Sequence, residues 1–137
     1  LERLVQQQWK TNRTIESIDK VKHGTRVELH ARLSRAKDFI YSCYAQPLTL
    51  AEMANVACLN QYYFLRQFKK VFHMSPHQLL LQRRLELAAQ LLKNRTSPIS
   101  EIGNVVGFND AAAFSKLFKK SFGVAPQGFR KSMGISE

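Results

Sequence analysis

Basic side chains recur with the same spacing at two places in this sequence, and they are its most prominent chemical groups. Each group has one basic residue followed three and four positions later by two lysines: Arg66, Lys69 and Lys70, then Lys116, Lys119 and Lys120. An arginine guanidinium can bond guanine through two hydrogen bonds, and a lysine ammonium binds phosphate oxygens. The repeated pattern therefore predicts a polyanionic partner.

The composition agrees with such a partner. The 137 residues include 21 Lys and Arg against 10 Asp and Glu, a formal net charge of +11. Most of the excess lies in residues 30–137, and the pI near 10.1 favours nucleic acid or an anionic membrane surface. The hydrophobic share of 45% is ordinary for a globular chain. No apolar stretch reaches the roughly 18 residues of a membrane span. Composition and apolar pattern together therefore argue against disorder, collagen and membrane insertion.

The length suits one compact domain or two very small ones. Because the chain begins at Leu1, we expect it to be a piece of a longer protein. Residues 1–29 hold two short amphipathic segments with a break at His23-Gly24-Thr25. We interpret them as a linker, or as the stub of an N-terminal sensor domain.

Metal binding, cofactors and catalysis find little support. Cys43 and Cys58 are too few for a disulfide framework and lie in apolar contexts, which predicts reduced, mostly buried thiols in a cytoplasmic protein. His73 and His77 have the spacing of a helical metal pair, but Pro76 between them marks a helix start. No Cys or Ser has a plausible base and orienting group. We therefore expect no metal, no cofactor and no enzyme activity.

The basic residues belong to a repeated unit. Glu52–Val56 resembles Glu101–Val105 at an offset of 49, and after the following turn the offset becomes 50. At that second offset the matching residues are Phe64, Phe68, Lys69, Lys70, Phe72 and Pro76 with Phe114, Phe118, Lys119, Lys120, Phe122 and Pro126. Each copy indicates a short helix, a tight turn and a longer basic helix, which is a helix-turn-helix unit.

Cap and turn residues fit this assignment. In the first copy Thr49 begins the short helix and Asn60 caps the next one. In the second copy Gly107 supplies the turn, and Asn109 or Asp110 caps. These residues thus indicate where helices begin in each unit and where the turn of the second unit lies.

A long helix is expected between the two units. From residue 76 to about 93 the chain has one apolar stripe, formed by Leu81, Leu85, Ala88 and Leu92. At 1.5 Å per residue this helix is roughly 27 Å long. Residues 31–44 also have helical spacing and are expected to pack under the first unit.

The second helix of each unit has an apolar and a basic side. Helical spacing turns these residues inward: Phe64, Phe68, Val71 and Phe72, and Phe114, Phe118, Ser121 and Phe122. Such a charged outer face is usually only solvated, but its recurrence in register favours binding. Successive major-groove openings lie about 34 Å apart, so both helices could enter one face of a DNA duplex.

The second unit and the long helix also contain specific motifs. These are Ile99-x-x-Ile102, Val106-Gly107-Phe108-Asn109-Asp110, Phe114-Ser115-Lys116-x-Phe118-Lys119-Lys120, Phe122-Gly123, Pro126-x-x-Phe129-Arg130 and Arg84-Leu85-x-x-Ala88-x-x-Leu91-Leu92. Together they resemble the AraC/XylS family of bacterial transcription regulators over about residues 30–133.

The resemblance implies an all-α fold of about seven helices. Two helix-turn-helix subdomains, about 30–75 and 95–133, would be joined by a linker helix at about 76–94. It also implies asymmetric promoter DNA as the partner, activation through RNA polymerase, and an N-terminal effector-binding or dimerisation domain. We expect this fragment to be monomeric and the full-length protein to be able to dimerise.

The resemblance also assigns roles to individual residues. The expected base contacts are Tyr62, Leu65, Arg66, Asn109, Ala111, Ala112, Ala113, Ser115 and Lys116. The expected phosphate contacts are Asn60, Lys69, Lys70, Arg84, Lys119 and Lys120.

Some positions depart from the family pattern. Ala111-Ala112-Ala113 removes most hydrogen-bonding groups from the second helix, so the first unit should contribute most base discrimination. Cys58 and His73 replace common glycines, and Gly103 replaces a common alanine. The cysteine predicts a turn that avoids the left-handed backbone region.

Two alternatives remain at this point. One is a DNA-targeting module attached to an enzyme, as in Ada-type repair methyltransferases, whose zinc-bound cysteine cluster is absent from this fragment. The other is a non-specific architectural binder, which predicts equal affinity for random duplexes.

Overall fold

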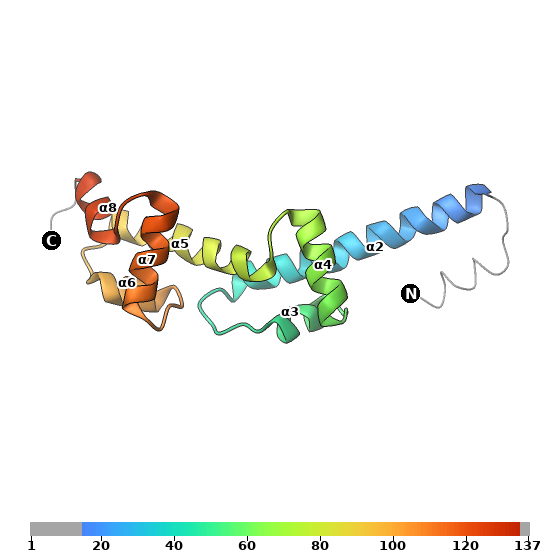
Figure 1. The fold of residues 1–137 in the computed structure, drawn as a ribbon, viewed down its shortest axis with the longest axis horizontal. Coiled ribbons are helices and arrows are strands. Elements are labelled where there is room, and N and C mark those ends of the chain that lie inside the picture. The colour runs from blue at the N-terminus through green and yellow to red at the C-terminus, as the bar shows by residue number, and fades with distance from the viewer. Residues whose placement is uncertain (1–14, 135–137) are drawn as a thin grey trace.

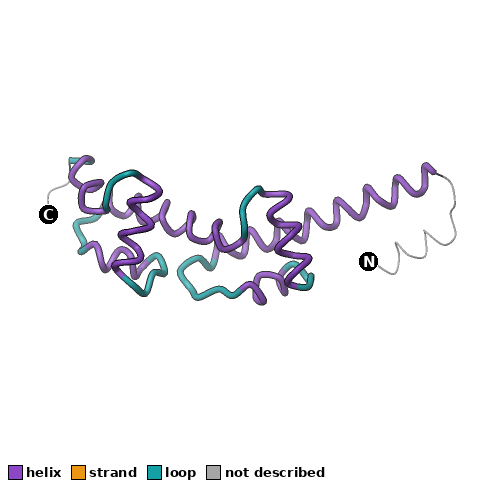
Figure 2. The backbone as a smooth tube through the Cα atoms, in the orientation of Figure 1, coloured by secondary structure: helices purple, strands orange, loops and turns teal. Residues whose placement is uncertain are grey.

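The computed structural model describes residues 15–134, with side chains from residue 25 onward, and this part consists of helices and loops (Figure 2). In chain order the helices are α2 (Ile15–Ser42), α3 (Leu50–Val56), α4 (Gln61–Phe72), α5 (Pro76–Asn94), α6 (Ile99–Val105), α7 (Ala111–Phe122) and α8 (Pro126–Ser132). Figure 1 shows an elongated molecule in which α2 lies along one half of the long axis and α5 along the other. The expected all-α fold with two helix-turn-helix units is confirmed.

Each unit packs around its own hydrophobic core. The first core includes Leu33, Ala36, Ile40, Met53, Ala54, Ala57, Phe64, Phe68, Leu79 and Leu80. The second includes Leu85, Ala88, Ala89, Leu92, Ile102, Val106, Phe108, Phe114 and Phe118. Because α5 contributes to both clusters, it is the element that joins the two units.

Capping side chains set where α3 and α5 begin. The Thr49 hydroxyl accepts a hydrogen bond from the Glu52 backbone N–H at 3.1 Å, and the Glu52 carboxylate accepts from the Thr49 N–H at 3.4 Å. Ser75 and Gln78 form the same reciprocal pair before α5, with Pro76 in the first turn. Such capping boxes satisfy N–H groups that a helix start leaves unpaired. The predicted starts at Thr49 and Pro76 are confirmed.

The turn after α3 has the same backbone form as the turn after α6. The Cys58 and Leu59 N–H groups donate to carbonyls of α3, each at 3.0 Å, and the N–H groups of Gly107 and Phe108 repeat the pattern after α6. This Schellman arrangement requires a left-handed residue. Cys58 has φ 57° and Gly107 has φ 109°. The expectation that Cys58 avoids the left-handed region was therefore wrong.

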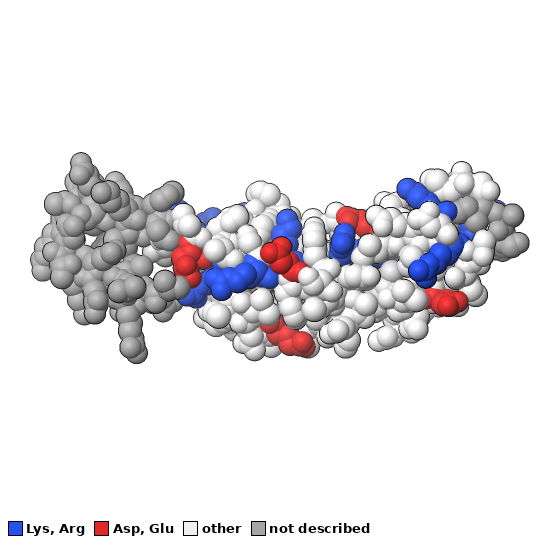
Figure 3. All heavy atoms as spheres, turned by 180° about the vertical axis from the view of Figure 1, so that it is seen from behind, with Lys and Arg blue, Asp and Glu red and all other residues white. Residues whose placement is uncertain are grey.

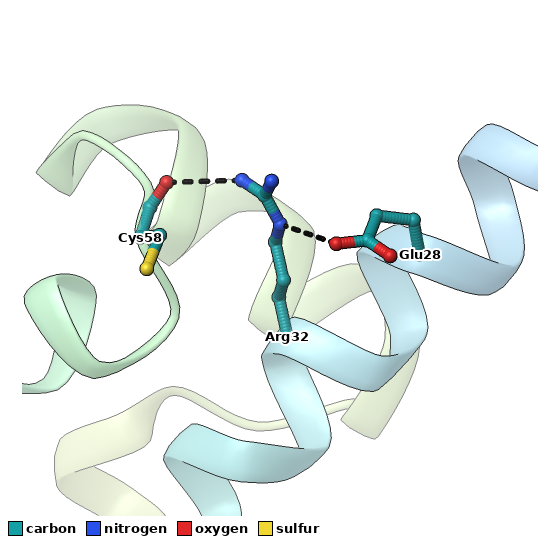
Figure 4. A network of polar contacts seen from close by, with 3 residues as sticks. All are labelled: Glu28, Arg32 and Cys58. Carbon is teal, nitrogen blue, oxygen red and sulfur yellow. Dashed lines mark hydrogen bonds and ion pairs between the residues drawn. The ribbon is translucent and has the colours of Figure 1, made fainter. Parts of the chain in front are cut away.

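Arg32 of α2 contacts the Cys58 turn from outside the α3–turn–α4 segment (Figure 4). One guanidinium nitrogen donates to the Cys58 carbonyl at 3.1 Å, and Nε donates to Glu28 Oε1 at 3.1 Å. The turn is thus fixed both by the backbone bonds at the end of α3 and by a side chain from α2. Such surrounding contacts sustain a left-handed backbone at a residue other than glycine.

Several other expectations need correction. The helix α2 runs without interruption through residues 23–25, so the expected break there was wrong. Phe122 is 38% exposed and Ser121 is also exposed, although the Phe122 ring stacks on the buried Phe118 ring with centroids 4.4 Å apart. Cys58 is exposed rather than buried. Of the two amphipathic segments expected in residues 1–29, the one around Leu4 lies outside the described residues.

Within the described part of the chain, no helix combines the length and apolar character needed to cross a membrane.

We predict that Gly107→Ala lowers the free energy of unfolding by about 2–4 kcal/mol, because it adds overpacking to left-handed strain. A Cβ at Gly107 would lie 2.8 Å from Arg84 Nε and 3.0 Å from the Tyr44 carbonyl oxygen. Gly123→Ala is the matched control, because Gly123 has φ +81° and no atom within 4 Å of the added carbon. The control should cost only about 1 kcal/mol. Equal losses in urea denaturation would contradict the close approach at Gly107.

Candidate nucleic-acid interface

The helices α4 and α7 are buried through equivalent phenylalanines. Phe64 and Phe68 of α4 are fully buried in the first core, and Phe114 and Phe118 of α7 in the second. The ring centroids lie 5.5 Å apart in the first pair and 5.9 Å in the second. Because these rings fix the rotation of each helix about its axis, the opposite sides of α4 and α7 point outward in both units.

The outward side of α4 carries an aromatic ring and three cations. Tyr62 is 88% exposed, and Arg66, Lys69 and Lys70 are exposed as well. The guanidinium carbon of Arg66 lies 6.0 Å from the centre of the Tyr63 ring, and Leu65 is half-buried. This side therefore offers a bidentate donor and two further positive charges to a partner.

The outward side of α7 repeats the cations but offers fewer polar groups. Lys116, Lys119 and Lys120 are exposed, as are Ala111 and Ala112. The remaining predicted residues of this helix, Ala113 and Ser115, are half-buried. The first turn of α7 thus presents methyl groups where the first turn of α4 presents Tyr62.

The predicted polar residues before α4 and α7 have different structural roles. Asn60 Oδ1 accepts a hydrogen bond from the Tyr63 N–H at 2.9 Å, so its amide NH₂ group is what remains for a phosphate. Before α7 the cap is Asp110, whose Oδ1 accepts from the Ala112 N–H at 2.9 Å. Asn109 is exposed next to that cap. A carboxylate here repels phosphate, whereas the carboxamide of Asn60 does not.

Arg84, a predicted phosphate contact, is not placed to bind phosphate. Its side chain is only 8% exposed, and its guanidinium donates to the Tyr44 carbonyl at 2.6 Å and to the Gln46 carbonyl at 2.9 Å. Burial lowers the pKa of Arg84 from its usual value. Because the guanidinium is enclosed and bonded within the protein, the assignment to phosphate was wrong.

The two outward faces belong to helices with similar directions. In Figure 1 α4 and α7 both cross the long axis of the molecule in front of α2 and α5. The 19 residues of α5 span about 28 Å at 1.5 Å per residue. Seen from behind, the molecule shows basic and acidic side chains interspersed (Figure 3). The sides of α4 and α7 are different, because their outward charges are all positive.

The candidate metal ligands do not form a site. His73 ends α4 with a left-handed backbone, and His77 is exposed in the first turn of α5. Among the residues that the structure describes, no three His, Cys, Asp or Glu side chains are placed to hold a metal ion.

Arg32 is the residue that the sequence does not single out. Its pairing with Glu28 follows the four-residue spacing of helical ion pairs and could have been predicted. Its bond to the Cys58 carbonyl joins residues 26 positions apart, and no local pattern indicates it.

Comparisons with known proteins agree with this geometry. Residues 53–132 match the family described as "Helix-turn-helix domain". The regulator AlkR of Acinetobacter baylyi, an HTH-type transcriptional regulator, is 33% identical over 117 residues, which are 85% of this chain and 38% of AlkR. The C-terminal domain of AraT, a response regulator from Geobacillus stearothermophilus, superimposes with a TM-score of 0.74 at 35% identity, covering 80% of this chain and 91% of that domain.

A more distant structure shares the fold. The DNA-binding domain of AdpA, solved in complex with a target DNA, has a TM-score of 0.70 at 21% identity, with coverage of 73% of this chain and 90% of that one. The present chain spans about two fifths or less of the length of the curated relatives it matches.

We predict that Asn60→Ala lowers the free energy of unfolding by about 1 kcal/mol, because α4 loses its N-cap. Asn60→Asp should keep the stability, since aspartate caps equally well. Thermal unfolding followed by circular dichroism measures both variants. Equal losses for Ala and Asp would show that the hydrogen bond to Tyr63 does not stabilise the helix.

Proposed function

The chain belongs to the AraC family of helix-turn-helix transcriptional regulators, and from this premise we propose that it binds specific sequences of double-stranded DNA with α4 and α7 in adjacent major grooves. The observation that carries the proposal is the repeated outward face. In both units two buried phenylalanines turn the same three cationic positions toward solvent. Solubility alone does not require that register.

The dimensions of the linker helix support docking of both units on one side of a duplex. The width of the major groove admits one α-helix. Successive openings of that groove lie about 34 Å apart. The length of α5 is roughly 28 Å. Together with the width of the helices packed at its two ends, this length is close to the distance between successive groove openings.

The two units differ in what they can read. Arg66 can bond both acceptors of guanine, and Tyr62 and Leu65 lie beside it on α4. In α7, Ala112 can touch a thymine methyl group, and Asn109, Ser115 and Lys116 supply the polar contacts. We therefore assign most base discrimination to the first unit and much of the phosphate affinity to the second, with phosphate contacts from Asn60, Lys69, Lys70, Lys119 and Lys120.

The wider role is proposed from the family. The full-length protein regulates transcription in the bacterial cytoplasm, activates a promoter through contact with RNA polymerase, and dimerises through a region outside residues 30–137. The fragment itself binds DNA as a monomer and catalyses no reaction.

Selection of preferred sites from a random DNA pool, followed by a footprint, tests this proposal. The expected product is an asymmetric site with two protected groove segments one helical turn apart. Absence of any enriched sequence, together with equal affinity for all duplexes, would favour the non-specific architectural binder instead.

We predict that Arg66→Ala weakens binding to the selected site by about 1–3 kcal/mol and relaxes the preference at one base pair. Arg66→Lys is the matched control, because it keeps the positive charge but loses the bidentate donor geometry of the guanidinium. It should retain affinity for random DNA while losing the same preference. An unchanged preference in Arg66→Ala would mean that another face of α4 reads the bases.

We predict that Lys119→Ala weakens binding to all sequences alike and lowers the slope of log affinity against log salt by about one. Arg26→Ala is the control, since Arg26 is an exposed cation in the N-terminal half of α2, outside α4 and α7. Titrations at several salt concentrations measure both slopes. If the salt slope of Lys119→Ala does not differ from that of the control, Lys119 does not contact the DNA.

A further inference from the structure

Arg84 lies where the two units meet. Its Nε and one terminal nitrogen donate to the carbonyls of Tyr44 and Gln46, which belong to the loop between α2 and α3 in the first unit. Its guanidinium carbon lies 5.8 Å from the centre of the Phe108 ring. Phe108 follows α6 and is part of the second core. One side chain of α5 thus contacts both units.

The neighbouring backbone also comes close at this point. A Cβ on Gly107 would be 2.8 Å from Arg84 Nε and 3.0 Å from the Tyr44 carbonyl. The turn of the second unit therefore packs directly on the loop of the first. The Tyr44 side chain packs against both hydrophobic cores. Two segments distant in sequence, the loop at Tyr44–Gln46 and the turn at Gly107–Phe108, thus meet at the Arg84 guanidinium of α5.

Among the described helices, the main contacts join helices within one unit or join a unit to α5. The helices α2, α3 and α4 pack on one another and on α5. At the other end α7 packs on α6 and α8, and all three pack on α5. Without the junction at Arg84, the two units would be connected mainly through the linker helix itself. A helix can bend along its length, so it does not by itself fix how α7 is turned relative to α4.

We propose that Arg84 is a positioning residue that fixes the relative orientation of the two helix-turn-helix units and thereby the half-site spacing that the protein accepts. This inference rests on the proposed function, since the spacing matters only if both units dock on one duplex. The physical basis is geometric. The planar guanidinium donates to two carbonyls of one unit while its face covers an aromatic ring of the other.

The first test measures affinity for the selected site and for versions with one base pair inserted or deleted between the half-sites. Each added pair shifts the second half-site by about 3.4 Å and rotates it by about 34°. The wild type should lose about tenfold or more in affinity, as for one mismatched pair. Arg84→Gln should lose less than about threefold, with unchanged affinity for a single half-site. A full wild-type penalty in Arg84→Gln would overturn the inference.

Arg83→Gln is the matched control. Arg83 precedes Arg84 on α5, and its guanidinium carbon lies 4.9 Å from the ring centre of Tyr41, which belongs to α2 in the first unit. The substitution removes the same charge from the same helix without touching Phe108. It should keep the wild-type dependence on spacing.

A second measurement needs no DNA and so separates the two proposals. Spin labels on Cys58 and on Asn104→Cys, in a Cys43→Ser background, report the distance between the units, because both labelled positions are exposed. The distance distribution should broaden in Arg84→Gln and stay narrow in Arg83→Gln. If the spacing between half-sites has no effect on wild-type binding, the proposed docking in two grooves is contradicted. The distance distributions then still test whether Arg84 fixes the orientation of the two units.

Arg84→Lys covers the case in which Arg84→Gln does not fold, as judged by circular dichroism. A lysine still offers a positive donor to the buried carbonyls but lacks the planar group that also covers Phe108. Its distance distribution should be broader than that of the wild type. An unchanged width would count against the orienting role.

Discussion

The continuity of α5 is the constraint on which the rest of the molecule depends. Its first turns contribute Leu79 and Leu80 to one core, and its later turns contribute Leu85, Ala88 and Leu92 to the other. Because the helix rises by a fixed 1.5 Å per residue, the number of residues between these groups sets the separation of the two cores. The separation of α4 and α7 follows from it, since each is held to its core by two phenylalanines.

The left-handed turns are the second requirement. In each unit the chain changes direction between its two helices within a few residues, and the Schellman bonds there require a positive φ. Gly107 meets that demand without strain and also lets the backbone approach Tyr44. Cys58 meets it under restraint from Arg32. The same hydrogen-bond pattern is thus formed with different residues at the two left-handed positions.

In the DNA complex that we propose, the arrangement of charge would separate affinity from specificity. In the proposed complex the lysines at the ends of α4 and α7 would attract phosphate at any sequence, whereas Arg66 of the first unit would be the main donor to bases. With Ala111 and Ala112 in its first turn, α7 has little hydrogen-bonding capacity to offer bases. Under the proposed docking both units are needed on one duplex, because the first would supply discrimination and the second much of the binding energy.

Local patterns in the sequence were sufficient for the helices from α3 to α7, the caps at Thr49 and Asn60, the repeat and the fully buried phenylalanines of α4 and α7, because these depend on neighbours within a few residues. The cationic faces of α4 and α7 could be predicted for the same reason. The tertiary structure alone decided the burial of Arg84, whose carbonyl partners lie 38 and 40 residues away. It also decided the left-handed backbone of Cys58. A charge is expected in water until a distant segment supplies acceptors, and no local spacing reveals where that segment will pack.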